Sequence, residues 1–173
     1  GNQIASIFKE FEIPLDGIIV SDSFQTIVKQ RILTNQQQLL RVDYESALPN
    51  FEQFEQELLQ RVTTLLTRMD GIILSDYAKG VLSPRIIKFV VSEAKKIGIP
   101  VVCDPGKGFE FNRYAGVTAI KPNRSEASGL TNIDLSDRPS ILKAAAILLH
   151  DSQADFLTIS LDKDGILLYA GES

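Results

Sequence analysis

The chain has 173 residues, of which 44% are hydrophobic and 23% charged, and its formal net charge is -4. This composition is typical of a folded domain with a buried core and excludes a disordered chain. The negative charge argues against a nucleic-acid or anionic-membrane surface, and the sequence has no apolar stretch long enough to span a bilayer. We therefore expect a cytoplasmic protein with neither nucleic acid nor membrane as a partner.

Residues 17–45 predict a small β lid ahead of the main fold. Two β-rich pieces, 26–33 and 38–43, flank a polar tip, as in a β-hairpin. Both pieces carry cations, so at least one face of the lid contacts water or a ligand: Lys29, Arg31 and Arg41. Helices are predicted on either side of the lid, at 3–11 and from a cap at Asn50 to about residue 68.

The remainder of the chain alternates short apolar strands with amphipathic helices. The expected strands are 71–74, 101–103, 117–120, 156–159 and 166–169, and the expected helices are 83–98 and 139–150. Such alternation predicts an α/β fold, with a Rossmann-like, mostly parallel sheet that has helices on both faces. We expect residues 1–173 to form a single domain that includes the lid.

A polar residue follows each of four predicted strands. In chain order these residues are Asp76, Asp104, Asn123 and Ser160. If the strands are parallel, all four lie along the carboxyl edge of the sheet, where open α/β sheets bind their ligands. Each residue alone is equally typical of a turn or a helix cap, so it is their convergence that predicts a binding edge.

Two glycine-containing loops at this edge allow two interpretations. Residues 76–80 and 104–108 each combine an acid, a lysine and glycine. They are either solvated turns or ligand-facing loops in which Lys79 and Lys107 bind phosphate while glycine allows close approach. Neither loop has the spacing of a P-loop.

The segment 123–126 is ambiguous in the same way. Asn123 followed by Glu126 matches a helix capping box, which needs no function. The same geometry presents free N–H groups to an anion, and Glu126 could hold Mg²⁺ directly or through water. Spacing alone favours the cap.

The single cysteine and the single histidine predict no chemistry. Cys103 ends an apolar run, so we expect a buried, inert thiol, and one cysteine allows no intrachain disulfide. His150 lies at the end of a predicted helix, where nothing nearby orients it as a base.

Three motifs resemble the ribokinase-like (PfkB) carbohydrate kinases in order and spacing: residues 74–80, 104–105 and 121–126. A narrower resemblance, to the D-glycero-β-D-manno-heptose 7-phosphate kinases of that family, rests on residues 26–31 and 35–45 and covers nearly the whole chain. The resemblance implies a Rossmann-like core with a β lid. It also implies transfer of the ATP γ-phosphoryl group to a sugar hydroxyl, here O1 of heptose 7-phosphate, in the synthesis of ADP-heptose for lipopolysaccharide.

The resemblance also implies where the ligands bind. Six residues would face ATP: Asn123, Arg124, Ser125, Glu126, Ser160 and Gly165. Nine would bind the sugar phosphate: Lys29, Arg31, Gln37, Gln38, Arg41, Asp76, Lys79, Asp104 and Lys107. Glu126 would bind Mg²⁺, directly or through water. Relatives suggest a homodimer formed through the lid and a fused or separate nucleotidyltransferase.

The chain departs from the family pattern at several points. It contains neither the upstream glycine-rich sugar-binding segment nor the Gly-Ala-Gly-Asp motif whose aspartate is the family's catalytic base, so this polypeptide alone is expected not to turn over substrate. Residues 104–107 carry one residue more than the usual Asp-Pro-Lys, and Asp162 replaces a small residue. Two alternatives stay open: another PfkB sugar kinase, and a non-catalytic sugar- or nucleotide-sensing domain of the same fold.

Overall fold

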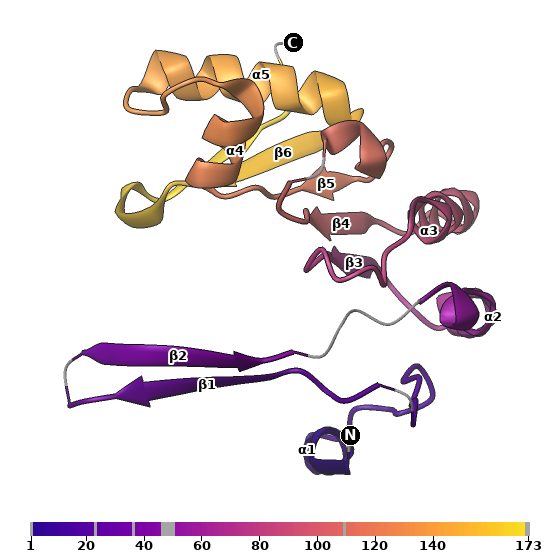
Figure 1. The fold of residues 1–173 in the computed structure, drawn as a ribbon. Helices are drawn as coiled ribbons and strands as arrows, with labels where there is room; N and C mark the ends of the chain where they lie inside the picture. The colour runs from indigo at the N-terminus through magenta and orange to yellow at the C-terminus, as the bar shows by residue number, and fades with distance from the viewer. Residues whose placement is uncertain (1, 23, 36, 46–50, 109, 172–173) are drawn as a thin grey trace. The chain divides into compact units, whose positions relative to one another are not determined.

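The structure is a computed structural model that describes residues 2–22, 24–35, 37–45, 51–108 and 110–171 (Figure 1). These residues form two compact units, 1–61 and 62–173, and the boundary falls within helix α2 (Glu52–Leu66). The predicted cap of this helix, Asn50, lies outside the described residues. Within the described ranges, every helix is too short or too polar to cross a membrane.

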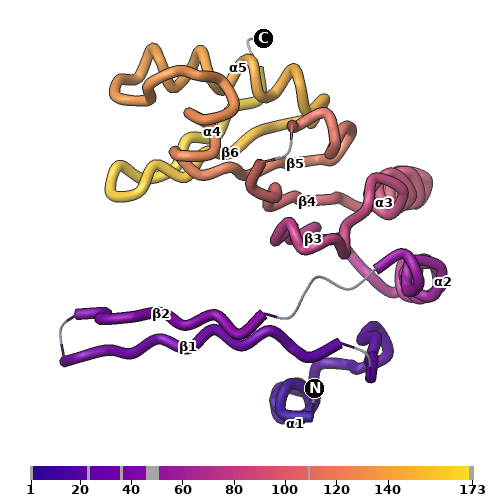
Figure 2. Tube along the Cα trace, in the orientation of Figure 1, coloured from indigo at the N-terminus to yellow at the C-terminus, as the bar shows by residue number. Residues whose placement is uncertain are grey.

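The first unit contains helix α1 (Asn2–Glu10) and an antiparallel hairpin of β1 (Val28–Leu33) and β2 (Gln38–Tyr44). Figure 2 traces the hairpin as two neighbouring stretches of the chain. The predicted hairpin is therefore confirmed, and its boundaries agree with the β-rich pieces to within two residues at each end. Both strands are exposed along almost their whole length within the unit.

One arginine connects the segment after α1 to α2 within this unit. The Arg61 guanidinium donates hydrogen bonds to the backbone oxygens of Asp16 at 2.6 Å and Ile18 at 3.0 Å. It also donates from Nη2 and Nε to Glu57 one helical turn earlier, at 2.6 and 3.0 Å. The carboxylate orients the guanidinium, so that one side chain satisfies two backbone oxygens of an irregular segment.

The second unit is built on a five-stranded sheet in the order β3-β4-β5-β6-β7. Its strands are β3 (Ile72–Ser75), β4 (Val101–Asp104), β5 (Ala119–Ile120), β6 (Phe156–Ser160) and β7 (Ile166–Tyr169). The first four are parallel, and β7 pairs antiparallel with β6. The predicted α/β fold with a mostly parallel sheet is confirmed.

Local sequence signals explain where the helices of this unit begin and end. Helix α3 (Pro84–Ile97) starts at Ser83, whose hydroxyl accepts from Ile86 N, and ends at Gly98 in the left-handed conformation. Helices α4 (Arg124–Thr131) and α5 (Arg138–Ser152) have side-chain caps of their own. The segment between β4 and β5 contains the short 3₁₀-helix η1 (Phe111–Tyr114), and a second one, η2 (Asp162–Asp164), lies between β6 and β7.

Strand order determines which face of the sheet these helices cover. The parallel strands lie side by side in chain order, and connections between parallel strands are right-handed, so successive connections return over the same face. Burial agrees with this arrangement. One face carries buried side chains, among them Leu74, Cys103, Ile120 and Leu157, and the opposite face carries the exposed side chains of Ile73, Val102 and Leu168.

Cys103 is fully buried on the covered face, as predicted. Burial raises the pKa of its thiol to about 12, and the nearby Asp76 and Asp104 carboxylates contribute. At pH 8 we therefore expect iodoacetamide to alkylate the folded chain far more slowly than the chain in urea, because only the thiolate reacts. Mass spectrometry gives both rates, and since the chain has one cysteine the labelling is site-specific.

The same shift has a consequence for stability at high pH. The folded-state pKa of the thiol lies above its ordinary value of 9.0, so deprotonation favours the unfolded chain. The contribution of this group to stability is complete below pH 9.0 and is lost as the pH rises toward about 12. Equal alkylation rates with and without urea at pH 8 would contradict the buried thiol.

Candidate functional site

The carboxyl ends of the parallel strands bring the four predicted polar residues to one edge of the sheet. Next to the end of β3, Asp76 N donates to the backbone oxygen of Asp104 at 3.0 Å. Further along, Asn123 forms a parallel bridge with Ser160. The predicted placement of these residues along one edge is confirmed, whereas their binding of a substrate stays a prediction.

A charged pair lies on this edge between β4 and β5. Lys121 Nζ is 3.3 Å from Asp104 Oδ1, and both side chains are about half exposed. An exposed pair of this kind contributes little to stability. Its two side chains are therefore available to rearrange around a ligand at low cost.

The first turn of α4 forms the capping box that the spacing favoured. Asn123 Oδ1 accepts from Glu126 N at 2.9 Å, and Glu126 Oε2 accepts from Asn123 N at 2.8 Å. The second carboxylate oxygen, Oε1, makes no hydrogen bond with the described residues. Ser125, between the two, is exposed.

That free oxygen fits a magnesium ion bound together with a nucleotide. Mg²⁺ in such sites takes one or two carboxylates, and substrate phosphates and water complete its shell. The part of the chain that the structure describes contains no group of three or more acidic, histidine or cysteine side chains that could bind a metal alone. Glu126 would therefore share the ion with phosphate oxygens.

Arg124, predicted to face the nucleotide, contacts the turn between β6 and β7. Its Nη2 donates to Asp164 Oδ2 at 2.6 Å and to the backbone oxygen of Leu161 at 3.2 Å, and its Nε is 3.5 Å from Asp162 Oδ2. Its Nη1 donates to the backbone oxygen of Leu135. Arg124 thus connects α4 to the turn whose ends carry Ser160 and Gly165.

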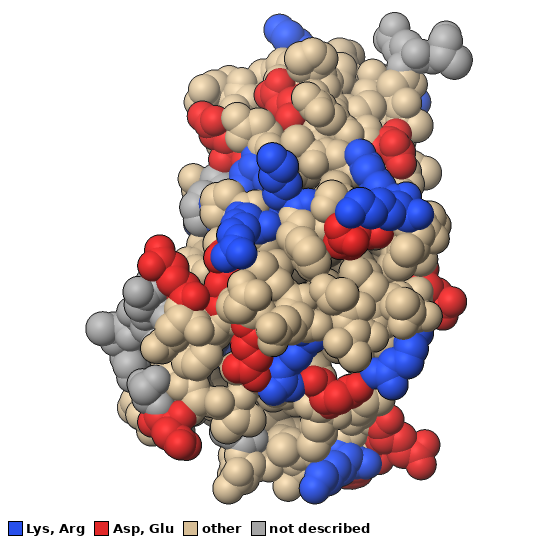
Figure 3. All heavy atoms as spheres, turned by 90° about the vertical axis from the view of Figure 1, so that its right-hand side faces the viewer, with Lys and Arg blue, Asp and Glu red and all other residues tan. Residues whose placement is uncertain are grey.

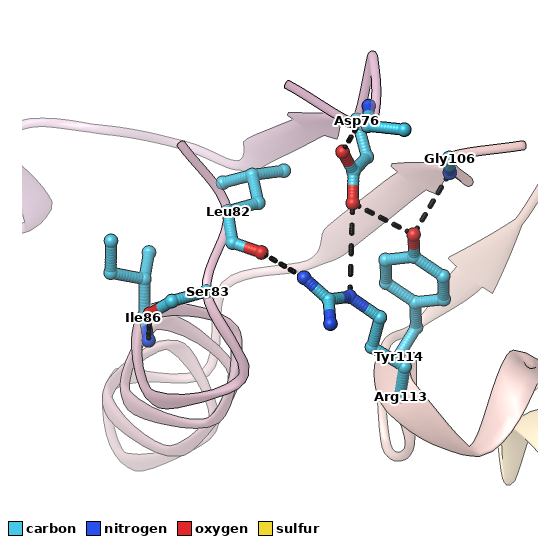
Figure 4. Close-up of polar contacts among 8 residues, drawn as sticks. Asp76, Leu82, Ser83, Ile86, Gly106, Arg113 and Tyr114 are labelled. Carbon is cyan, nitrogen blue, oxygen red and sulfur yellow. Dashed lines mark hydrogen bonds and ion pairs between the residues drawn. The ribbon is translucent and has the colours of Figure 1, made fainter. Parts of the chain in front are cut away.

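Asp76, predicted to bind the sugar, has a side chain that is only 4% exposed (Figure 4). Its Oδ1 accepts from Ala78 N at 2.8 Å, and its Oδ2 accepts from the Tyr114 hydroxyl at 2.8 Å. Arg113 Nε lies 3.9 Å from Oδ2, beyond hydrogen-bond distance. Both oxygens of the carboxylate are therefore hydrogen-bonded within the protein. The lysines of the loops 76–80 and 104–108 differ in exposure, since Lys79 is partly buried and Lys107 is exposed.

Sequence reasoning missed Arg113 and Tyr114, because it predicted no helix or strand between residues 103 and 117. The available signal was the spacing of Phe111 and Tyr114, two aromatic residues three positions apart in a polar segment. That spacing places both side chains on one side of a 3₁₀ turn, and both are buried.

The predicted lid residues of the first unit lie on the exposed hairpin. Lys29 Nζ is 3.4 Å from both Asp43 Oδ2 and Glu45 Oε1, and Arg41 Nε is 3.0 Å from Asp43 Oδ1. Although desolvation opposes it, the Lys29 hydrogen bond and the charges of Arg41 and Lys29 lower the pKa of Asp43. Gln37 and Gln38 are exposed at the tip, where Gln38 pairs with Leu33.

The hairpin register sets two arginines against each other. Arg31 is directly opposite Arg41, so the two side chains lie on the same face, which Lys29 shares. Like charges directly opposite each other destabilise a strand pair. Arg31 has no ion pair within the described residues, so Asp43 compensates only one of the two arginines.

Figure 3 shows basic and acidic side chains interspersed over the face in view.

The comparisons with known proteins agree with this fold. The family described as pfkB family carbohydrate kinase matches residues 1–173. The chain is 34% identical to "Bifunctional protein HldE" of Wolinella succinogenes over 169 residues, which are 98% of this chain and 35% of that protein. It is 37% identical to the protein of the same name from Magnetococcus marinus over 174 residues, which cover 99% of this chain and 36% of the relative. The chain thus spans about a third of the length of these relatives.

Solved structures show the same fold at lower sequence identity. The crystal structure of Sa239 superposes with a TM-score of 0.78 at 19% identity and covers 99% of this chain and 55% of that one. The tetrameric inhibited form of phosphofructokinase-2 from Escherichia coli gives 0.71 at 21% identity, with 99% and 56% covered. The match over all 173 residues, together with the ribokinase-like fold, shows that the chain belongs to the pfkB family of carbohydrate kinases.

Proposed function

We propose that this chain provides nucleotide- and sugar-binding residues of an ATP-dependent kinase whose substrate is heptose 7-phosphate, phosphorylated at O1 on the route to ADP-heptose. The observation that carries the choice of a phosphorylated sugar is the Arg31–Arg41 pair. Two arginines held face to face are unfavourable unless an anion lies between or beside them. The resemblance of residues 26–31 and 35–45 to heptose 7-phosphate kinases supports the heptose.

The reaction needs positioning and charge neutralisation more than covalent chemistry by the protein. The sugar oxygen attacks the γ-phosphorus, the bond from that phosphorus to the leaving ADP oxygen breaks, and the hydroxyl proton passes to a base. We assign the first turn of α4 to the nucleotide phosphates, because its free N–H groups and helix dipole favour anions. When bound, Mg²⁺ supplies positive charge to the phosphate oxygens, and Glu126 holds it.

The remaining proposed roles concern the sugar. Lys79 and Lys107, on the loops after β3 and β4, bind the sugar phosphate as point charges. Asp104 accepts a hydrogen bond from a sugar hydroxyl. The hairpin cations Lys29, Arg31 and Arg41, with Gln37 and Gln38, bind the phosphate that the sugar already carries. Such a transfer also requires that water be excluded from the reacting phosphate, because water would otherwise compete as the phosphoryl acceptor.

A sugar panel tests the proposal in the natural polypeptide that carries this sequence. We expect ATP-dependent phosphorylation of heptose 7-phosphate and much weaker activity on unphosphorylated heptose, ribose and fructose 6-phosphate. Activity confined to unphosphorylated sugars would remove the role of the hairpin cations. Binding of ATP and sugar without turnover would favour a sensing domain.

Two arginine variants test the hairpin directly. For Arg31→Gln and Arg41→Gln we expect the KM for heptose 7-phosphate to rise about tenfold, because each loses a charge-assisted hydrogen bond to phosphate. The KM for ATP should not change. Lys9→Gln on α1, which removes an exposed cation elsewhere in the same unit, is the matched control. An equal rise with unphosphorylated heptose would contradict binding of the sugar's phosphate.

The same proposal extends to partners. The word "bifunctional" in the names of the HldE relatives supports a second activity beside the kinase. For that activity we propose the nucleotidyltransferase, fused or separate, that the family resemblance implies. The second face of the hairpin supports a homodimer formed through the lid, because Val28, Ile32, Leu40 and Tyr44 are 43–58% exposed there. We also propose a cytoplasmic location, where ATP is available as the phosphoryl donor.

A further inference from the structure

One hydroxyl group joins the two loops that follow β3 and β4 (Figure 4). The Tyr114 side chain is fully buried. Its hydroxyl donates to Asp76 Oδ2 at 2.8 Å and accepts from Gly106 N at 2.8 Å. Both the donor and the acceptor capacity of this oxygen are used, so the loop that begins at Asp76 and the loop that contains Gly106 are held at a fixed separation.

The preceding residue holds the far end of the first loop. Arg113 Nη2 donates to the backbone oxygen of Leu82, immediately before the residue that caps α3. Arg113 Nε is also 3.9 Å from Asp76 Oδ2. Two neighbouring residues of η1 therefore fix the beginning and the end of the loop, and residues 77–81 lie between these anchors.

The backbone of the loop depends on those anchors. Ala78 has φ 55°, a left-handed conformation that residues with a Cβ rarely adopt, and Gly80 has φ 92°. Such a conformation persists where the surroundings determine it, and here Asp76 Oδ1 accepts from Ala78 N. Lys79 lies between these two residues, so the direction of its side chain depends on the loop conformation that the Asp76 carboxylate stabilises.

The buried charge of Asp76 stabilises its contacts with Tyr114 and Arg113. A carboxylate that is 4% exposed requires hydrogen bonds or a cation to offset its lost hydration, and Tyr114 and Arg113 provide them. Burial, together with the hydrogen bond to Asp76 and its charge, raises the pKa of Tyr114 above its ordinary value. The hydroxyl therefore keeps its proton, and its hydrogen bond to Asp76, throughout the physiological pH range.

We infer that Tyr114 is a positioning residue for the sugar: its hydroxyl fixes the two loops relative to each other and so orients Lys79 and Lys107. The inference rests on the proposed function, in which these loops form the sugar side of the site. In this arrangement Asp76 does not contact the sugar and acts together with Tyr114 to hold the loop.

The experiment compares Tyr114→Phe with Tyr169→Phe in the natural polypeptide. Both changes remove one phenolic oxygen, but the Tyr169 hydroxyl has no hydrogen bond with the described residues. For Tyr114→Phe we expect the KM for heptose 7-phosphate to rise at least about tenfold, while the KM for ATP changes less than about twofold. The amide of Gly106 should exchange its hydrogen about tenfold faster, because it loses its acceptor.

A double variant separates positioning from a loss of stability. If Tyr114 acts through Asp76, Tyr114→Phe combined with Asp76→Asn should be no worse for sugar binding than the more damaging single change. Additive losses would overturn this coupling. If the KM values for the sugar and for ATP rise equally, in proportion to the fall in the unfolding midpoint, Tyr114 has only a structural role.

The two readouts distinguish failure of the inference from failure of the proposed function. A wild-type polypeptide that phosphorylates no sugar would contradict the proposed function. Exchange of the Gly106 amide is measured without substrate, so an unchanged rate in Tyr114→Phe would contradict the connection between the loops whatever the enzyme's activity.

Discussion

Replacing Glu126 by glutamine is expected to leave the stability almost unchanged and to reduce the proposed phosphorylation about 100-fold. Glutamine can serve as the third helical residue of a capping box, so the hydrogen bond from Asn123 N is retained. An amide is a much poorer ligand for Mg²⁺ than a carboxylate. The single substitution thus separates the cap from the proposed metal site.

The measurements are urea unfolding for the cap and activity at varied Mg²⁺ for the metal. We expect the free energy of unfolding to change by less than about 0.5 kcal/mol and half-saturation to need more Mg²⁺. The stabilisation of the fold by Mg²⁺ with an ATP analogue, read from the unfolding midpoint, should also decrease. Glu93→Gln in α3, which loses only an i,i+3 pair with Lys96, is the control. Full activity in Glu126→Gln would mean that Glu126 caps the helix and does not bind Mg²⁺.

Replacing Arg124 by methionine is expected to lower the free energy of unfolding by about 2–4 kcal/mol. The side chain is 25% exposed and donates to the backbone oxygens of Leu135 and Leu161, two buried residues. In the methionine variant these two backbone oxygens lose their hydrogen-bond donor, and this accounts for most of the expected loss. Asp162 and Asp164 are 77% and 58% exposed, so their ion pairs contribute little of the total.

Urea unfolding monitored by circular dichroism measures the change. Arg138→Met at the start of α5 is the matched control, because that arginine is exposed and its charge is unfavourable at a helix N-terminus. Arg124→Lys should recover little, since one ammonium group cannot reach two backbone oxygens and two carboxylates at once. A loss below about 0.5 kcal/mol in Arg124→Met would show that the turn does not depend on this side chain.

Elements with strong periodicity or clear caps were predictable from the sequence. Helix α3 begins at the predicted Ser83-Pro84 and ends before Gly98, and β7 has the predicted bounds. The strand expected at 117–120 is shorter, because only Ala119–Ile120 pair with both neighbouring strands. The position of the four polar residues along one edge followed from parallel pairing, which apolar strands between helices predict well.

The partners of the site residues were not predictable. Nothing in the spacing of Asp76 shows that its carboxylate is buried against a tyrosine 38 positions later. The same holds for Arg124 and Asp164, which are 40 positions apart. Such long-range polar contacts depend on where loops meet in three dimensions, whereas the capping box at Asn123 joins residues three apart and was visible.

The pairing of β1 with β2 limits how this hairpin can change in evolution. Successive side chains of a strand alternate between its faces, so inserting or deleting a single residue within β2 would turn Arg41 to the side of Val28 and Ile32. Arg31 would stay where it is, and the pair would be lost without any change in composition. Length variation that keeps the arginine pair therefore requires steps of two residues, or a bulge like the register shift that this hairpin has between Ile32 and Leu33.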